Sequence, residues 1–115
     1  MELCTGIIDK ADKSMEQIAL AEVEEECGYK ASKAEFVQTF RASIGTGGAP
    51  MSLFYVEVTE DDRVSAGGGL ANEGERIEVV EQTIDEIKAY LAEPEVNCPT
   101  FTLYGLQWFL ANKLY

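Results

Sequence analysis

The sequence predicts an α/β fold, with helices and strands mixed along a single domain of 115 residues, and three observations support this. Residues 14–29 (SMEQIALAEVEEECGY) have the capping pattern and the terminal glycine of a short helix. Residues 35–44 and 51–59 are rich in β-branched and aromatic residues, which is typical of strands. Residues 100–115 are apolar over most of a helical circumference, so we expect a helix that is buried on two sides.

The remaining elements follow from turn and capping signals, in chain order. Residues 2–8 indicate a short strand that leads into a loop at 9–13. The glycine-rich stretch 45–50 separates the two later strands, so we expect them to form an antiparallel pair. An irregular segment at 60–75 follows. Thr83 and Glu86 then form a second capping box, which predicts a helix that runs to about Ala92.

Composition excludes several classes of function. The chain has 9 basic and 21 acidic residues, and its net charge of -12 argues against nucleic-acid binding through phosphate contacts. Histidine is absent, which excludes the triads that need it and leaves acid–base chemistry to carboxylates, tyrosines or lysines. No apolar run reaches membrane-spanning length, and the first residues do not resemble a targeting signal. We therefore expect no membrane partner.

The cysteines indicate a reducing environment. Cys4, Cys27 and Cys98 are an odd number and include no C-x-x-C pair. This spacing predicts neither a disulfide framework nor a zinc site. We therefore expect the protein to be cytoplasmic.

The acidic helix at 14–29 is the main candidate for a functional site. On a helical wheel, Glu22 and Glu26 fall inside the apolar arc and Glu25 lies at its edge, whereas Glu16 and Glu24 lie on the flanks. A solvated acidic face is the ordinary interpretation of such a charge run. However, three carboxylates half turned toward a core repel one another and should take up protons unless a cation lies among them. Oxygen ligands of this kind suit Mg²⁺ or Mn²⁺.

The same helix carries the motif of a known family. Residues 22–29 (EVEEECGY) resemble the E-U-x-E-E-x-G-U core of the Nudix box, in which U is a bulky apolar or aromatic residue. Residues 2–9 (ELCTGIID) are similar to the lead-in of the nucleoside-diphosphate-sugar branch of that family. Two positions depart from the pattern. Ala21 stands where the family usually has an arginine, and the acidic loop position falls on Asp12 or Lys13 in a slightly longer loop.

The resemblance spans nearly the whole chain, and it is strongest to the uridine diphosphate glucose diphosphatases, with the adenosine diphosphate ribose diphosphatases next. It rests on residues 54–59, 67–70, 73–75, 77–80 and 108–110. It implies an α/β/α sandwich with a mixed sheet, and a strand at 76–82. Family members carry strands, and commonly a dimerising region, before the lead-in. We therefore expect this chain to be a partial Nudix domain without its amino-terminal strands, and the full-length protein to be a homodimer.

The resemblance also implies an activity and a set of site residues. The expected reaction is Mg²⁺-dependent hydrolysis of the pyrophosphate bond of a nucleotide sugar, with UDP-glucose giving UMP and glucose 1-phosphate. The expected metal ligands are Glu22, Glu25, Glu26 and Glu75, with Mn²⁺ as an alternative ion. Glu73 is the expected base, and Glu25 is also assigned to catalysis. The residues expected to border the substrate are Thr5, Gly6, Gly47 and Gly48.

Three other interpretations stay open at this stage. The substrate could be ADP-ribose or another ADP-sugar. The chain could instead be a truncated, non-catalytic Nudix-like module for binding or oligomerisation, which would expose a sheet edge and an apolar helix. It could also bind divalent cations in some other way, although it lacks the D-x-[DN]-x-[DN]-G loop of EF-hand calcium sites.

Overall fold

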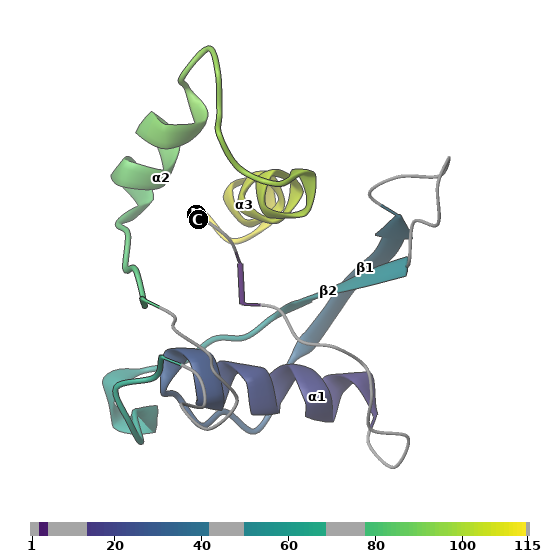
Figure 1. Ribbon diagram of the computed structural model, residues 1–115, viewed down its shortest axis with the longest axis vertical. Helices are drawn as coiled ribbons and strands as arrows, with labels where there is room; N and C mark the ends of the chain where they lie inside the picture. The colour runs from purple at the N-terminus through teal and green to yellow at the C-terminus, as the bar shows by residue number, and fades with distance from the viewer. Residues whose placement is uncertain (1–2, 5–13, 42–49, 69–77, 115) are drawn as a thin grey trace. The chain divides into compact units, whose positions relative to one another are not determined.

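The computed structural model describes residues 3–4, 14–41, 50–68 and 78–114 (Figure 1). The mixture of helices and paired strands confirms the predicted α/β class. The described chain divides into two compact units, one formed by residues 4, 14–41, 50–68 and 78–79 and the other by Leu3 and residues 80–114. The elements are α1 (Met15–Glu22), the π-helix η1 (Val23–Cys27), β1 (Glu35–Arg41), β2 (Pro50–Tyr55), the 3₁₀ helix η2 (Glu60–Asp62), α2 (Ile84–Leu91) and α3 (Thr100–Asn112).

The first unit begins with the acidic helix, which starts and stops where the sequence predicts. The Ser14 hydroxyl accepts a hydrogen bond from the Gln17 backbone N–H at 3.2 Å, and the Gln17 side chain accepts one from the Ser14 N–H at 3.0 Å. This reciprocal capping box satisfies two amides that the first turn leaves without partners. The helix ends at Gly28, whose φ of 83° is left-handed. What the sequence did not predict is that the last turn, η1, is π-helical.

The strands β1 and β2 form the predicted antiparallel pair, from Glu35 opposite Tyr55 to Arg41 opposite Pro50. A bulge interrupts the register between Phe36 and Gln38. The rings of Phe36 and Phe54 meet edge to face with centroids 5.6 Å apart. The prediction that the second strand extends to Thr59 was wrong. β1 begins at Glu35, opposite Tyr55, so residues 56–59 have no partner on β1.

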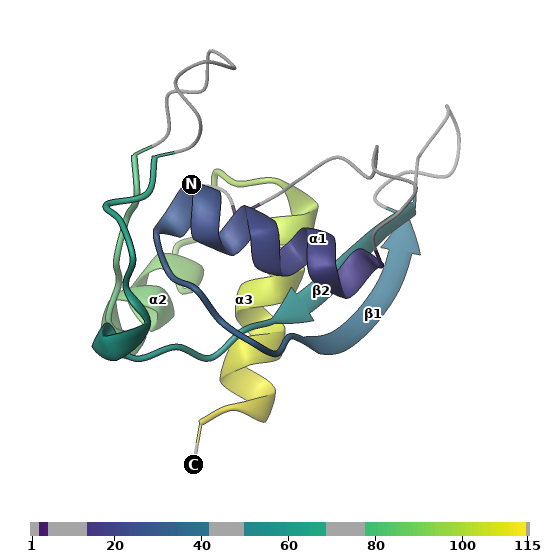
Figure 2. The same cartoon turned by 90° about the horizontal axis from the view of Figure 1, so that it is seen from below.

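Helix α1 lies beside this pair of strands (Figure 2). The Ser52 hydroxyl of β2 donates a hydrogen bond to the Met15 sulfur at 3.6 Å. Within the described part of this unit, the buried apolar side chains are those of Ile18, Ala34 and Leu53, one each from the helix, the link and a strand.

The second unit contains α2 and α3. The predicted capping box forms at the start of α2. The Thr83 hydroxyl accepts a hydrogen bond from the Glu86 N–H at 3.1 Å, and the Glu86 carboxylate accepts one from the Thr83 N–H at 2.9 Å. On α3, Phe101 and Thr102 are buried, and the Thr102 hydroxyl accepts a hydrogen bond from the Leu3 N–H at 3.2 Å. The larger aromatic residues further along α3 are half-buried. The helix ends at Asn112, short of the predicted 115.

Two further strand predictions were wrong where they can be compared with the structure. Residues 78–82, from the predicted strand 76–82, are not in a strand, and Val80 is 60% exposed. Leu3 and Cys4, from the predicted strand 2–8, are not in a strand either. A strand forms only where a neighbouring strand supplies hydrogen-bond partners, and a sequence pattern does not supply that neighbour. In the described ranges, no helix is long and apolar enough to cross a membrane.

Candidate functional site

The predicted glutamates lie at the end of the acidic helix. Glu22 is the last residue of α1, and Glu25 and Glu26 lie in η1. All three are half-buried, whereas Glu16 and Glu24 are exposed. This difference in exposure agrees with the helical wheel, which placed the first three glutamates in or beside the apolar arc and the other two outside it. The carboxylates that were expected to turn toward the core are therefore partly shielded from water.

The π-helical turn changes how these carboxylates are arranged. Hydrogen bonds in a π-helix run from residue i to i+5, and such turns are frequent at functional sites. Here the Gly28 N–H donates to the Val23 carbonyl at 3.1 Å as well as to the Glu24 carbonyl at 3.0 Å. The wider turn moves Glu25 and Glu26 away from their α-helical positions relative to Glu22. Among the described residues, no three Asp, Glu or Cys side chains lie together as a group that could hold a metal ion.

The other predicted site residues lie outside the described residues, so their roles stay predictions. They belong to the lead-in, to the glycine-rich loop and to the loop that follows Gly68. They are Thr5, Gly6, Gly47, Gly48, Glu73 and Glu75.

A pair of thiols lies beside Glu26. The Cys4 thiol donates a hydrogen bond to Glu26 Oε2 at 2.7 Å, and Cys27 directly follows Glu26 in the chain. The pKa of Cys4 is raised well above its usual range, first by the Cys27 thiol, then by desolvation and by Glu26. The Cys4 thiol lowers the pKa of Cys27 to about 7, against the raising effects of burial and Glu26. The sequence carries no signal for the contact between Cys4 and Glu26, because the two residues are distant along the chain.

A second segment is bonded to the end of the helix. The Val64 N–H donates to the Gly28 carbonyl at 2.8 Å, and the Gly68 N–H donates to the Glu26 carbonyl at 2.9 Å. A Cβ on Gly67, which has a φ of 76°, would lie 2.5 Å from the Glu26 carbonyl oxygen. The two backbones therefore approach closely because glycine occurs on both sides. Gly68, the last described residue before the loop that carries the predicted base, lies against a predicted metal ligand.

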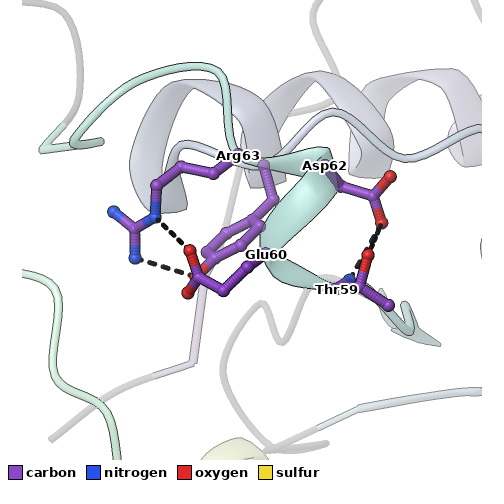
Figure 3. Close-up of polar contacts among 5 residues, drawn as sticks. Thr59, Glu60, Asp62 and Arg63 are labelled. Carbon is purple, nitrogen blue, oxygen red and sulfur yellow. Dashed lines mark hydrogen bonds and ion pairs between the residues drawn. The ribbon is translucent and has the colours of Figure 1, made fainter.

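Figure 3 shows the exposed polar contacts that brace this junction. The Arg63 guanidinium donates to the Tyr29 hydroxyl at 2.8 Å and to Glu60 at 3.3 Å, and it lies 4.9 Å from the centre of the Tyr29 ring. The Tyr29 hydroxyl, next to it, contributes most to raising the pKa of Arg63. Asp62 caps η2 by accepting from the Thr59 N–H at 2.9 Å. Exposed ion pairs add little stability, so we interpret this group as fixing orientation.

An open surface depression of about 460 Å³ lies next to this brace, and sequence reasoning missed it. It is lined by residues 30–33 together with Glu57 and Asp62. Two of the lining side chains, Lys30 and Lys33, are basic in a chain with a net charge of -12. Two acidic side chains face the same space, so the depression has mixed charge rather than the character of a dedicated anion site.

The arrangement as a whole offers carboxylate oxygens at a partly shielded helix end, next to a place where two backbones are hydrogen-bonded to each other. Carboxylate oxygens are hard donors, which suit Mg²⁺ or Mn²⁺ and not a soft metal.

Comparison with known proteins supports the motif. No model of a protein family matches the chain. The chain is 38% identical over 112 residues to the uridine diphosphate glucose pyrophosphatase NUDT14 of Bos taurus, a match that covers 96% of this chain and 50% of the relative. It is 36% identical over 114 residues to the protein of the same name in Mus musculus, covering 97% and 51%. The chain thus spans about half the length of these curated relatives. The similarity confirms the resemblance predicted from residues 22–29, because the chain is similar over nearly its whole length to the uridine diphosphate glucose pyrophosphatases.

Proposed function

We propose that the protein hydrolyses the pyrophosphate bond of a nucleoside diphosphate sugar with the help of Mg²⁺, and that UDP-glucose gives UMP and glucose 1-phosphate. The observation that carries the proposal is the Nudix-like run 22–29 at the half-buried end of α1 and η1. The names of the bovine and murine relatives support the substrate class. An acidic chain also needs a cation to accept an anionic pyrophosphate, because its own charge of -12 repels it.

We assign the following roles within this proposal. Glu22, Glu25 and Glu26 would hold the metal, with Glu75 as a further ligand, because all of them supply the hard oxygen donors that Mg²⁺ and Mn²⁺ prefer. A bound ion would neutralise the pyrophosphate and polarise a phosphorus atom. Glu73 would take the proton from the attacking water. Thr5, Gly6, Gly47 and Gly48 would border the substrate.

The proposal includes an architecture and a setting. We propose one Nudix domain with an α/β/α sandwich and a mixed sheet, of which this chain is a part, and a homodimer in the full-length protein. The antiparallel pair, and the hydrogen bond from Ser52 on β2 to Met15 of the acidic helix, support the sandwich. A reducing, cytoplasmic setting fits the three cysteines, which are all free thiols.

The deciding experiment compares two neighbouring glutamates. Purified protein with Mg²⁺ is given UDP-glucose, and UMP release is measured for the wild type, Glu25→Gln and Glu24→Gln. Both variants remove one charge from the same turn, but Glu25 is half-buried and assigned to the site, whereas Glu24 is exposed. We expect Glu25→Gln to lower turnover by roughly 100-fold or more, as loss of a catalytic carboxylate does, and Glu24→Gln to keep the wild-type rate. Chelation with EDTA should abolish turnover in the wild type.

Two alternatives are read from the same assay. A parallel reaction with ADP-ribose ranks the adenine and uracil nucleotides. Equal rates for Glu25→Gln and the wild type would remove that residue from the mechanism. A folded wild-type chain that releases no nucleotide from either substrate would favour the non-catalytic binding or oligomerisation module. Its oligomeric state by light scattering would then be the next measurement.

A further inference from the structure

Two stretches of backbone in the first unit are hydrogen-bonded to each other at the end of the acidic helix. The Gly68 N–H donates to the Glu26 carbonyl at 2.9 Å, and the Val64 N–H donates to the Gly28 carbonyl at 2.8 Å. Glycine adopts many backbone conformations, so it allows this close approach without enforcing it. Side-chain contacts between the two stretches therefore add a constraint that the glycines do not supply.

Three side chains supply such contacts, and we call them the Arg63 cluster (Figure 3). The Arg63 guanidinium donates to the Tyr29 hydroxyl at 2.8 Å and to the Glu60 carboxylate at 3.3 Å, and the Tyr29 hydroxyl donates to Glu60 at 3.1 Å. Each of the three residues thus contacts the other two. The guanidinium also lies 4.9 Å from the centre of the Tyr29 ring, whose electrons attract a cation.

The cluster lies next to the backbone hydrogen bonds in the chain. Tyr29 directly follows Gly28, and Arg63 directly precedes Val64. Tyr29 and Arg63 are themselves paired in an isolated antiparallel bridge. Both the side-chain contacts and the neighbouring backbone bonds must break before the two stretches can separate, so the cluster opposes local opening at this place.

We propose that Arg63 is a positioning residue, which acts through the Tyr29 hydroxyl to hold residues 64–68 on the end of the acidic helix. Exposed contacts of this kind add little to global stability, so the effect is local. Its consequence for turnover rests on the proposed function, in which Glu26 is a metal ligand and the loop after Gly68 carries the base. In that reaction Arg63 acts through the backbone that it holds.

The test is amide hydrogen exchange of the chain without added metal, followed by NMR. Arg63→Met removes the cation and keeps a long side chain, whereas Tyr29→Phe removes the hydroxyl and keeps the ring. In each variant we expect the Val64 and Gly68 N–H groups to exchange roughly fivefold faster, the size expected when an exposed network is lost. The amides that pair β1 with β2 are the internal reference, and their exchange should not change.

A double variant and a matched control make the result specific. If Arg63 and Tyr29 act as one unit, the double variant exchanges about as fast as the faster single variant, whereas independent contributions multiply. Arg41→Met removes the same charge at an exposed position of β1, and it should leave Val64 and Gly68 unchanged. Unchanged exchange in Arg63→Met, multiplied effects in the double variant, or equal acceleration of the β1 and β2 amides would overturn the proposal.

A kinetic measurement connects this position to the reaction. With UDP-glucose and Mg²⁺, we expect Arg63→Met to lower kcat about tenfold and to leave KM nearly unchanged, because a misplaced catalytic group costs rate more than binding. Faster exchange with an unchanged kcat would overturn the positioning role in the reaction. A wild-type chain without turnover would contradict the proposed function alone, and the exchange rates would still decide whether Arg63 holds residues 64–68.

Discussion

At the scale of single residues, Gly28 is the position on which the candidate site depends most. Its φ of 83° is left-handed, and a Cβ there would collide with the Ser65 carbonyl oxygen of the segment bonded to it. The same residue ends η1 and accepts from the Val64 N–H at 2.8 Å. Any other residue would therefore strain its own backbone and push residues 64–68 away from Glu26.

We predict that Gly28→Ala destabilises the fold by at least about 1–2 kcal/mol, the cost of placing a Cβ in the left-handed region, with a further cost from the collision. The measurement is the free energy of unfolding in urea. Ser32→Ala, at an exposed position in the link that follows, is the control and should change stability by less than about 0.5 kcal/mol. A Gly28→Ala variant as stable as this control would mean that the junction does not have the close approach described here.

At the scale of elements, the helix caps could be predicted from the sequence. The change from an α-helical to a π-helical turn and the ends of the strands could not. Ser14 with Gln17, and Thr83 with Glu86, are local signals, because all their partners lie within one turn. The π-helical turn at 23–27 involves the hydrogen bonds that the Gly28 N–H donates to the Val23 and Glu24 carbonyls. A helical wheel assumes a constant angle per residue, so it does not predict such a turn. β2 ends at Tyr55 because β1 begins at Glu35, which is a property of the partner strand. The contact between Cys4 and Glu26 likewise follows from the folded chain alone.

The cap of α2 leads to a prediction on pH dependence. The Glu86 carboxylate accepts from the Thr83 backbone N–H at 2.9 Å, and this bond lowers the pKa of Glu86 below its usual value. A folded-state pKa below the unfolded one means that the bond stabilises α2 above the unfolded pKa and is lost as the pH falls through the folded pKa. We expect the midpoint of the Glu86 titration, measured by NMR, to lie at lower pH in the folded chain than in the chain unfolded in urea. Identical midpoints would show that the cap does not form in solution.

At the scale of the whole molecule, the dominant property is the net charge of -12, from 21 acidic and 9 basic residues. Acidic residues are concentrated in η1 and η2, and Glu60 of η2 forms an ion pair with Arg63 at 3.3 Å. Unbalanced charge of one sign destabilises a compact state through self-repulsion. Salt shortens the range of that repulsion, from about 30 Å at 0.01 M to about 8 Å at 0.15 M.

We therefore predict that raising the salt concentration over this range increases the melting temperature by several degrees, since about 1 kcal/mol moves the melting temperature of a domain of about 100 residues by roughly 4–8 °C. Sodium chloride and tetramethylammonium chloride should act equally, because screening depends on ionic strength and not on the cation. A rise with sodium alone would point to a bound ion instead, and a constant melting temperature in both would show that self-repulsion is unimportant.

Mg²⁺ at equal ionic strength should raise the melting temperature further in the wild type than in Glu25→Gln, because an ion that binds only the folded state adds its binding free energy to stability. A larger Mg²⁺-induced rise in the wild type than in Glu25→Gln would indicate that the ion binds at the acidic helix, whereas equal rises would indicate general screening. The comparison needs no substrate.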